Sequence, residues 1–198
     1  VYGLKSAADP QISPDGEWVV YGVTEIRAET HKRIRHLWIS RLDGSDARQL
    51  TTAGEQNSLA RWSPGGRSLA FTSDRDGKQA LYLLSLDGGE ARKLVTHPNG
   101  IGPAHWSPDG KTIAFQLGVE PWSPVSLMVM KPDGSGAHAV LDDYSGAYVW
   151  SPDGQWLLIQ SNGELLLHHL KTDAQTRLGE ASTYGIPDWY LPGGTPPS

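Results

Sequence analysis

The chain has 198 residues, of which 38% are hydrophobic and 20% charged, an ordinary composition for a soluble globular protein. Its formal net charge of -5 argues against a nucleic-acid partner, because phosphate binding requires clustered basic residues. The absence of cysteine excludes disulfides, thiol catalysis and cysteine-bound zinc. No apolar run approaches the roughly 18 residues of a membrane span.

A five-residue motif recurs along the chain. Residues 106–110 read Trp-Ser-Pro-Asp-Gly, and residues 150–154 repeat them letter for letter. The copy at 62–66 changes one residue, the copy at 12–16 begins with Ile, and a loosened copy stands at 189–194. The serines of the first four copies are 50, 44 and 44 residues apart. A period in this range is typical of repeat architectures.

In chain order, each unit contains short runs of β-prone residues bounded by Gly, Pro and Asp, and these predict antiparallel strands. The loop between the second and third strands varies most: it is long in unit one (24–35), moderate in unit three (117–125) and a tight Asn162-Gly163 hairpin in unit four. The predicted strands after the motif are 18–21, 37–39 and 48–50; 67–72, 81–84 and 91–95; 112–115, 127–130 and 139–141; and 156–159, 165–167 and 176–178.

Four antiparallel strands repeated about every 44 residues predict an all-β fold, a β-propeller with four full repeats and a partial fifth. We expect one domain over 1–198. Packing blade against blade would bury the apolar faces, and open blade edges would favour a homo-oligomer. The expected blades are 7–52, 53–97, 98–143 and 144–180, with the partial unit 181–198 after them.

The motif has the chemistry of a turn. Pro presets φ near -65°, Gly accepts a positive φ, and the Ser hydroxyl can hold neighbouring backbone N–H groups. We expect a hairpin between the first two strands of each blade, with the Trp enclosed between blades. Because the same residues recur in every unit, we interpret the Ser and Asp as structural and not as a catalytic pair.

The segment Asp9–Tyr21 and the motif copies resemble the WD-like propellers of the TolB type, which are similar to the N-terminal propeller of the prolyl oligopeptidase family. Units one and two are closest to the dipeptidyl and acylaminoacyl peptidases, through the Asp9-Pro10-Gln11 opening, the long first loop, and segments 72–77 and 88–94. Units three and four are closer to generic TolB-type repeats. TolB-type propellers imply protein-interaction scaffolds, often periplasmic, whereas the peptidase relatives imply a propeller that gates peptide access to a hydrolase domain.

That hydrolase domain is absent from this sequence, which contains no Gly-x-Ser-x-Gly nucleophile elbow. We therefore expect a non-catalytic binding module for a protein or peptide, without a cofactor. The alternative is the substrate-gating propeller of a prolyl-oligopeptidase-family serine peptidase. The resemblance implies a periplasmic or secreted location, and the cytoplasm stays open.

Three other clusters suggest metal or partner sites. His168 and His169 are adjacent on a predicted strand, so they point to opposite faces and cannot chelate together. Residues 74–77 begin like a calcium loop but continue with the wrong ligands, which favours a polar hairpin tip. The basic residues of 27–36 are interleaved with glutamates, and this segment is either a solvated loop or a docking loop for an acidic partner.

The candidate binding site is positional. In each unit one residue directly precedes the motif Trp or its equivalent, and most of these residues are polar. If this register faces the central channel, they line its mouth, where they would either bind a small polar ligand or peptide terminus or border only water. The residues are Gln11, Arg61, His105, Val149 and Asp188.

Overall fold

The computed structural model describes residues 5–119, 121, 124–181 and 189. In these residues it contains sixteen strands and no helix, so nothing there is a helix long and apolar enough to cross a membrane. The strands are β1 (Lys5–Ile12), β2 (Trp18–Ile26), β3 (Arg33–Arg41), β4 (Arg48–Gln49), β5 (Asn57–Trp62), β6 (Ser68–Ser73), β7 (Ala80–Ser85), β8 (Arg92–Thr96), β9 (His105–Trp106), β10 (Ile113–Leu117), β11 (Ser126–Met130), β12 (His138–Leu141), β13 (Gly146–Trp150), β14 (Trp156–Ser161), β15 (Glu164–His169) and β16 (Ala174–Glu180).

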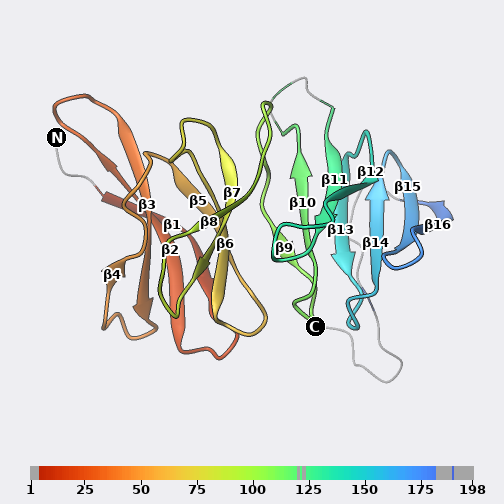
Figure 1. The fold of residues 1–198 in the computed structure, drawn as a ribbon, viewed down its shortest axis with the longest axis horizontal. Coiled ribbons are helices and arrows are strands. Elements are labelled where there is room, and N and C mark those ends of the chain that lie inside the picture. The colour runs from red at the N-terminus through yellow and green to blue at the C-terminus, as the bar shows by residue number, and fades with distance from the viewer. Residues whose placement is uncertain (1–4, 120, 122–123, 182–188, 190–198) are drawn as a thin grey trace.

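The strands form four antiparallel sheets, each with its four strands in sequence order. The sheets succeed one another in chain order across the molecule, from β1–β4 at one end to β13–β16 at the other (Figure 1). This arrangement confirms the all-β propeller fold and its four full repeats. The expected partial fifth unit, 181–198, lies outside the described residues apart from positions 181 and 189.

The prediction of a long first loop was wrong. β2 and β3 stay paired from Trp18 opposite Arg41 to Ile26 opposite Arg33, so only residues 27–32 form the turn. At this far end residues 26 and 33 are exposed, residues 24, 25 and 35 are half-buried and only Ile34 is fully buried, so the sequence shows no regular apolar alternation. The charged sequence therefore concealed the strand extension.

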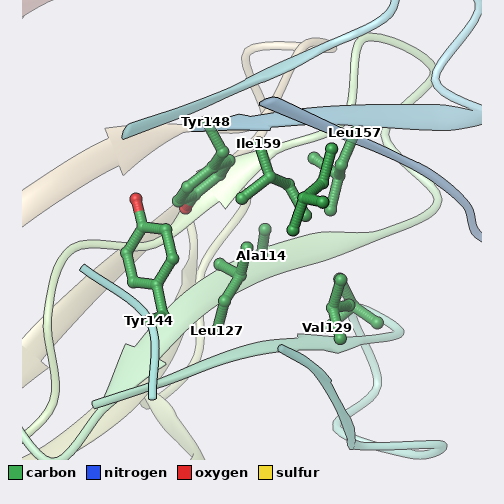
Figure 2. Packing of buried hydrophobic residues seen from close by; sticks show 9 residues of the cluster. Ala114, Leu127, Val129, Tyr144, Tyr148, Leu157 and Ile159 are labelled. Atoms are coloured by element: carbon green, nitrogen blue, oxygen red, sulfur yellow. The ribbon is translucent and has the colours of Figure 1, made fainter. Parts of the chain in front are cut away.

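The hydrophobic core consists of three clusters, each between two consecutive sheets. β6 illustrates how one sheet serves two clusters: Leu69 and Phe71 pack toward the first sheet, whereas Ala70 packs toward the third. The alternation results from the two-residue period of a strand. Between the third and fourth sheets, Tyr144 and Tyr148 lie at one end of an otherwise aliphatic cluster (Figure 2). Every sheet is thus held by its neighbours.

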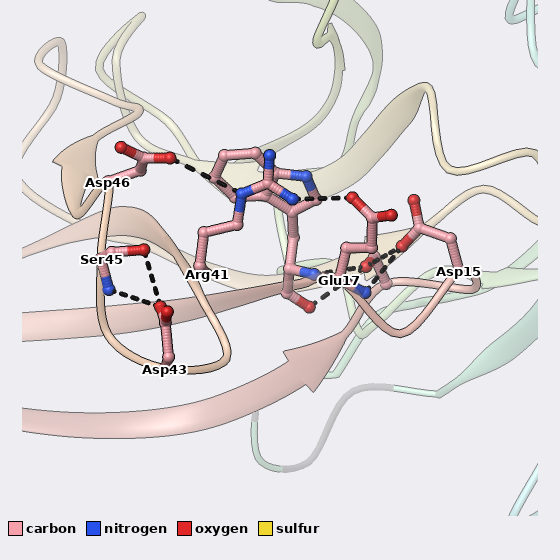
Figure 3. Close-up of polar contacts among 8 residues, drawn as sticks. Asp15, Glu17, Arg41, Asp43, Ser45 and Asp46 are labelled. Atoms are coloured by element: carbon pink, nitrogen blue, oxygen red, sulfur yellow. Dashed lines mark hydrogen bonds and ion pairs between the residues drawn. The ribbon is translucent and has the colours of Figure 1, made fainter.

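The motif turns have the predicted chemistry. In the third unit the Ser107 hydroxyl donates to Asp109 Oδ1 at 2.8 Å and accepts the Thr112 N–H at 2.9 Å. Gly110 has φ +70° and its N–H donates to the Ser107 carbonyl at 2.9 Å. The first turn has the same hydroxyl-to-Asp15 contact, and beside it Arg41 lies over the Trp18 ring at 4.2 Å and pairs with Glu17 (Figure 3).

The turns also connect neighbouring sheets. A Cβ added to Gly110 would meet Pro64 of the preceding turn at 3.7 Å, so consecutive turns lie against each other. The indole N–H of Trp62 donates to the Gln11 carbonyl at 2.9 Å, and that of Trp106 donates to the Arg61 carbonyl at 3.3 Å. The motif tryptophans are half-buried, not enclosed as the sequence predicted. The indole N–H groups of Trp62 and Trp106 link neighbouring sheets, and the rings of Trp62, Trp106 and Trp150 line a cavity.

Candidate functional site

Three of the predicted site residues, Gln11, Arg61 and His105, line one cavity of about 330 Å³. They lie at the turn ends of β1, β5 and β9, each directly before the position of the motif Trp. Val149 holds the same register on β13 but is absent from the lining, and Asp188 lies outside the described residues. The remaining lining residues are mostly apolar: Ile12, Trp62, Pro64, Ala104, Trp106 and Trp150.

Two β-bulges position this register. The pairing of β1 with β2 shifts between Ala8 and Gln11, and that of β5 with β6 shifts between Ser58 and Arg61. An extra residue in each strand adopts a positive φ: Asp9 at 52° and Leu59 at 54°. A bulge re-aims the side chains that come after it, and a left-handed leucine is an uncommon, strained conformation. The backbone thus departs from regular pairing just before the site.

Asp9 joins the first two sheets across the cavity. Its carboxylate accepts Arg61 Nη1 at 3.1 and 3.2 Å and Gln11 Nε2 at 3.1 Å. The Asp9 and Arg61 side chains are each 25% exposed, so the pair is screened less than a surface ion pair. Arg61 Nη1 also donates to the Ala60 carbonyl at 2.8 Å. One side of the guanidinium is therefore fixed, whereas Nε and Nη2 have no acceptor among the described residues.

His105 supplies a titratable group. Its ring lies 5.3 Å from the Tyr148 ring while its other side is open to solvent. The protein packed around the imidazole and, second, the nearby Arg61 charge lower the pKa of His105 below its usual 6.5. At neutral pH the ring is neutral, with one nitrogen that donates and one that accepts. Neither nitrogen has a hydrogen-bond partner in the part of the chain that the structure describes.

The regular indole link fails at the fourth sheet. By analogy with Trp62 and Trp106, Trp150 should donate to the His105 carbonyl, yet its buried Nε1 has no partner among the described residues. Two residues earlier, Tyr148 occupies the position that the smaller Ala60 and Ala104 hold in other units. The Trp150 ring lines the cavity, whereas its Nε1 is buried.

Sequence reasoning missed three features of this site: Asp9, the two bulges and the free indole of Trp150. The Asp9-Pro10 pair carried some signal, because Asp tolerates a left-handed conformation. Leu59 carried none, since nothing in its side chain favours a positive φ. The only sequence signal for a difference at Trp150 was Tyr148, which replaces the equivalent Ala60 and Ala104.

The residues of the calcium-like segment have structural contacts. Asp74 accepts the backbone N–H groups of Glu55 and Gln56 at 2.8 and 2.9 Å, and thereby fixes the segment that leads into β5. Asp76 accepts the Tyr82 hydroxyl at 2.9 Å and pairs with Lys93. No group of three metal-ligating side chains converges among the described residues.

The other two clusters are also engaged in contacts. His168 is buried on one face of β15, whereas His169 meets the Trp156 ring edge-on on the other face, which confirms their opposite orientation. In the basic segment, Lys32 pairs with Glu55 at 3.0 Å. Gln56 reaches back to the Arg33 carbonyl at 2.5 Å, so the hairpin tip is fastened to the start of the second sheet.

Known proteins share this architecture. The Bacillus subtilis protein named "Uncharacterized peptidase YuxL" is 33% identical over 85 residues, which are 42% of this chain and 13% of that protein. TolB from Acinetobacter baumannii superposes with a TM-score of 0.63 at 22% identity, over 89% of this chain and 43% of that one. The β-propeller domain of the Trilobed protease from Pyrococcus furiosus gives 0.68 at 15% identity, over 92% and 59%.

The chain therefore covers less than two thirds of each of these proteins, and the two structural likenesses concern the fold alone. They confirm the predicted resemblance to both TolB-type and peptidase propellers. The model of a further family, described as the Tricorn protease N-terminal beta propeller domain, matches residues 34–169, more than half of the sequence. The chain belongs to this family of protease N-terminal β-propeller domains.

Proposed function

We propose that this propeller is a non-catalytic binding module that holds the carboxyl end of a peptide at the cavity lined by Gln11, Arg61 and His105. The observation that carries the proposal is the convergence of unpaired donors on an aromatic-lined hollow. Arg61, with its free Nε and Nη2, and His105, with its unpaired imidazole, both belong to this lining, and the Trp150 ring completes the wall beside them.

The composition of the cavity favours a peptide over a free inorganic anion. Small-molecule sites combine apolar walls with a few polar groups that fix orientation. Here Trp62, Trp106 and Trp150 provide the walls, and such rings accept aliphatic side chains. Because Asp9 already neutralises much of the Arg61 charge, a compact dianion would gain little from this site. A peptide C-terminus matches the cavity, because its one carboxylate suits the polar groups and an apolar side chain suits the tryptophan walls.

A second function is favoured by the family match. The chain belongs to a family of protease propeller domains, and one relative is named a peptidase. We infer that in a longer protein the same cavity would contact peptides on their way to a catalytic domain. Both functions require peptide binding, and they differ in whether the bound peptide is then passed on for cleavage. The periplasmic or secreted location stays a prediction from the resemblance to TolB.

Peptide binding is tested by titrating the chain with Ala-Ala-Leu and with its C-terminal amide, monitored by tryptophan fluorescence. We expect the free acid to change the emission and the amide to bind at least about tenfold more weakly. Binding should tighten as pH falls below 6.5, because a bound carboxylate favours protonated His105. Replacing Arg61 and His105 together by Ala should abolish the response while the fold persists.

The matched control is Arg67→Ala, an exposed arginine outside the cavity, which should bind as the parent does. Equal affinity in the double variant and the parent would refute the proposed site. A peptidase assay on the full-length gene product distinguishes the two functions. A gating propeller predicts peptidase activity there that changes in the Arg61/His105 variant, whereas a pure binding module predicts no peptidase activity.

A further inference from the structure

A larger cavity, of about 500 Å³, lies between the first two sheets and shares no lining residue with the cavity of Gln11, Arg61 and His105. One wall is the segment after β4, residues 50–53. The opposite wall comes from the 75–76 turn and from β7, β8 and the turn between them. The polar side chains that matter for its chemistry are Thr52, Arg75, Asp76, Tyr82, Glu90 and Lys93.

Contacts on this wall hold the Arg75 guanidinium in place and leave its two terminal nitrogens without an acceptor among the described residues. Its guanidinium lies 4.7 Å from the centre of the Tyr82 ring and 5.2 Å from that of Phe71. Its Nε donates to Ser73 Oγ at 3.2 Å. Among the described residues neither terminal nitrogen has an acceptor, and no carboxylate pairs with the side chain. Cation–π contacts fix the plane of a guanidinium without consuming its N–H donors.

The carboxylate next to Arg75 in the chain is already engaged. Asp76 accepts the Tyr82 hydroxyl and pairs with Lys93. Burial and, second, the hydrogen bond to Asp76 raise the pKa of Tyr82 to about 12, so the phenol keeps its proton at neutral pH. The hydrogen bond to Lys93 and then that to Tyr82 hold the pKa of Asp76 below 3.8. Asp76 and Lys93 therefore cancel each other, which leaves Arg75 and Glu90 as the two charged groups of the lining without an ion pair among the described residues.

We propose that this cavity binds a small organic monocarboxylate, with Arg75 as its receptor. A planar carboxylate matches the two parallel N–H donors of a guanidinium fork. One free cation neutralises one negative charge, whereas a phosphate dianion would be repelled by Asp76 and Glu90 in the same lining. The volume is of the size that small-ligand sites have. An α-amino acid or dipeptide fits these limits best, because Glu90 offers a partner for its ammonium group.

The experiment is an NMR titration of the ¹⁵N-labelled chain with Ala-Ala, its C-terminal amide, and inorganic phosphate. We expect Ala-Ala to shift the Arg75 Nε–H resonance and the amides of Thr52 and Tyr82. The amide form and phosphate should shift them at least about tenfold less at equal concentration. The Arg75 resonance reports on the parent chain itself, so this outcome does not depend on any variant.

Variants then separate the two cavities. Arg75→Gln should weaken binding at least about tenfold and Arg75→Lys by a smaller factor, because lysine keeps the charge but loses the fork. Lys78→Gln, in the same hairpin but outside the cavity, and the Arg61/His105 double variant should leave these shifts unchanged. Unchanged affinity for Ala-Ala in Arg75→Gln would overturn the proposal. So would resonance shifts on addition of Ala-Ala that are confined to the cavity of Gln11, Arg61 and His105.

Discussion

Ser107→Ala measures what the motif turn contributes to stability. The Ser107 side chain is fully buried, and its hydroxyl donates to the Asp109 carboxylate at 2.8 Å, with the Thr112 carbonyl a second acceptor at 3.1 Å, and accepts the Thr112 N–H at 2.9 Å. Removing the hydroxyl leaves the Thr112 N–H without this partner, at a cost of about 1–3 kcal/mol. The bond to the partly exposed Asp109 adds about 1.5 kcal/mol, the lower end for a charged partner. We expect a total loss of about 2.5–4.5 kcal/mol.

The second unit provides the matched control. Ser63 has the same place in its turn, but Gly65 replaces the Asp, and only the Ser68 N–H bond remains, at 3.1 Å. Ser63→Ala should therefore cost only about 1 kcal/mol. Urea unfolding monitored by tryptophan fluorescence compares the two variants with the parent, and the slope of the transition should stay unchanged. Equal losses in both variants would refute the role of the Ser–Asp pair.

Two further predictions concern the same motif. The Ser151 hydroxyl and then the Gln155 N–H lower the pKa of Asp153 below 3.8, so its contribution is present above pH 3.8 and is lost as pH falls through the lower folded pKa. Asp153→Asn should show a smaller drop in urea midpoint between about pH 4.5 and 2.5 than the parent, and identical curves would contradict this. Trp62→Phe should lose about 1 kcal/mol more than Trp150→Phe, because within the described part of the chain the Trp62 indole N–H has an acceptor and that of Trp150 has none. Thermal or urea unfolding of the two variants checks the difference, and equal losses would remove the indole link from the account.

The fold was predictable because its signals are local. Pro108 and Gly110 determine a turn by their own backbone preferences. The number of copies of that turn in the sequence predicts the number of sheets. The register of Gln11, Arg61 and His105 was predictable for the same reason, since position relative to the turn fixes which face of the strand each residue occupies.

The parts that escaped prediction depend on contacts between units. Leu59 adopts a left-handed conformation only because β5 must pair with β6 around a bulge, and no property of leucine announces it. The position of Arg75 over Phe71 and Tyr82 arises from packing between β6, β7 and the turn that joins them. Single-sequence patterns carry no record of such distances.

The proposed function is tested most directly by the affinity for a free peptide carboxylate of the cavity lined by Gln11, Arg61 and His105. This affinity is compared between the parent and the Arg61/His105 double variant across about pH 5–8, the range in which a histidine changes charge. We expect binding in the parent that tightens toward low pH, and no binding in the variant at any pH. Affinity that is independent of pH and identical in both proteins would contradict it.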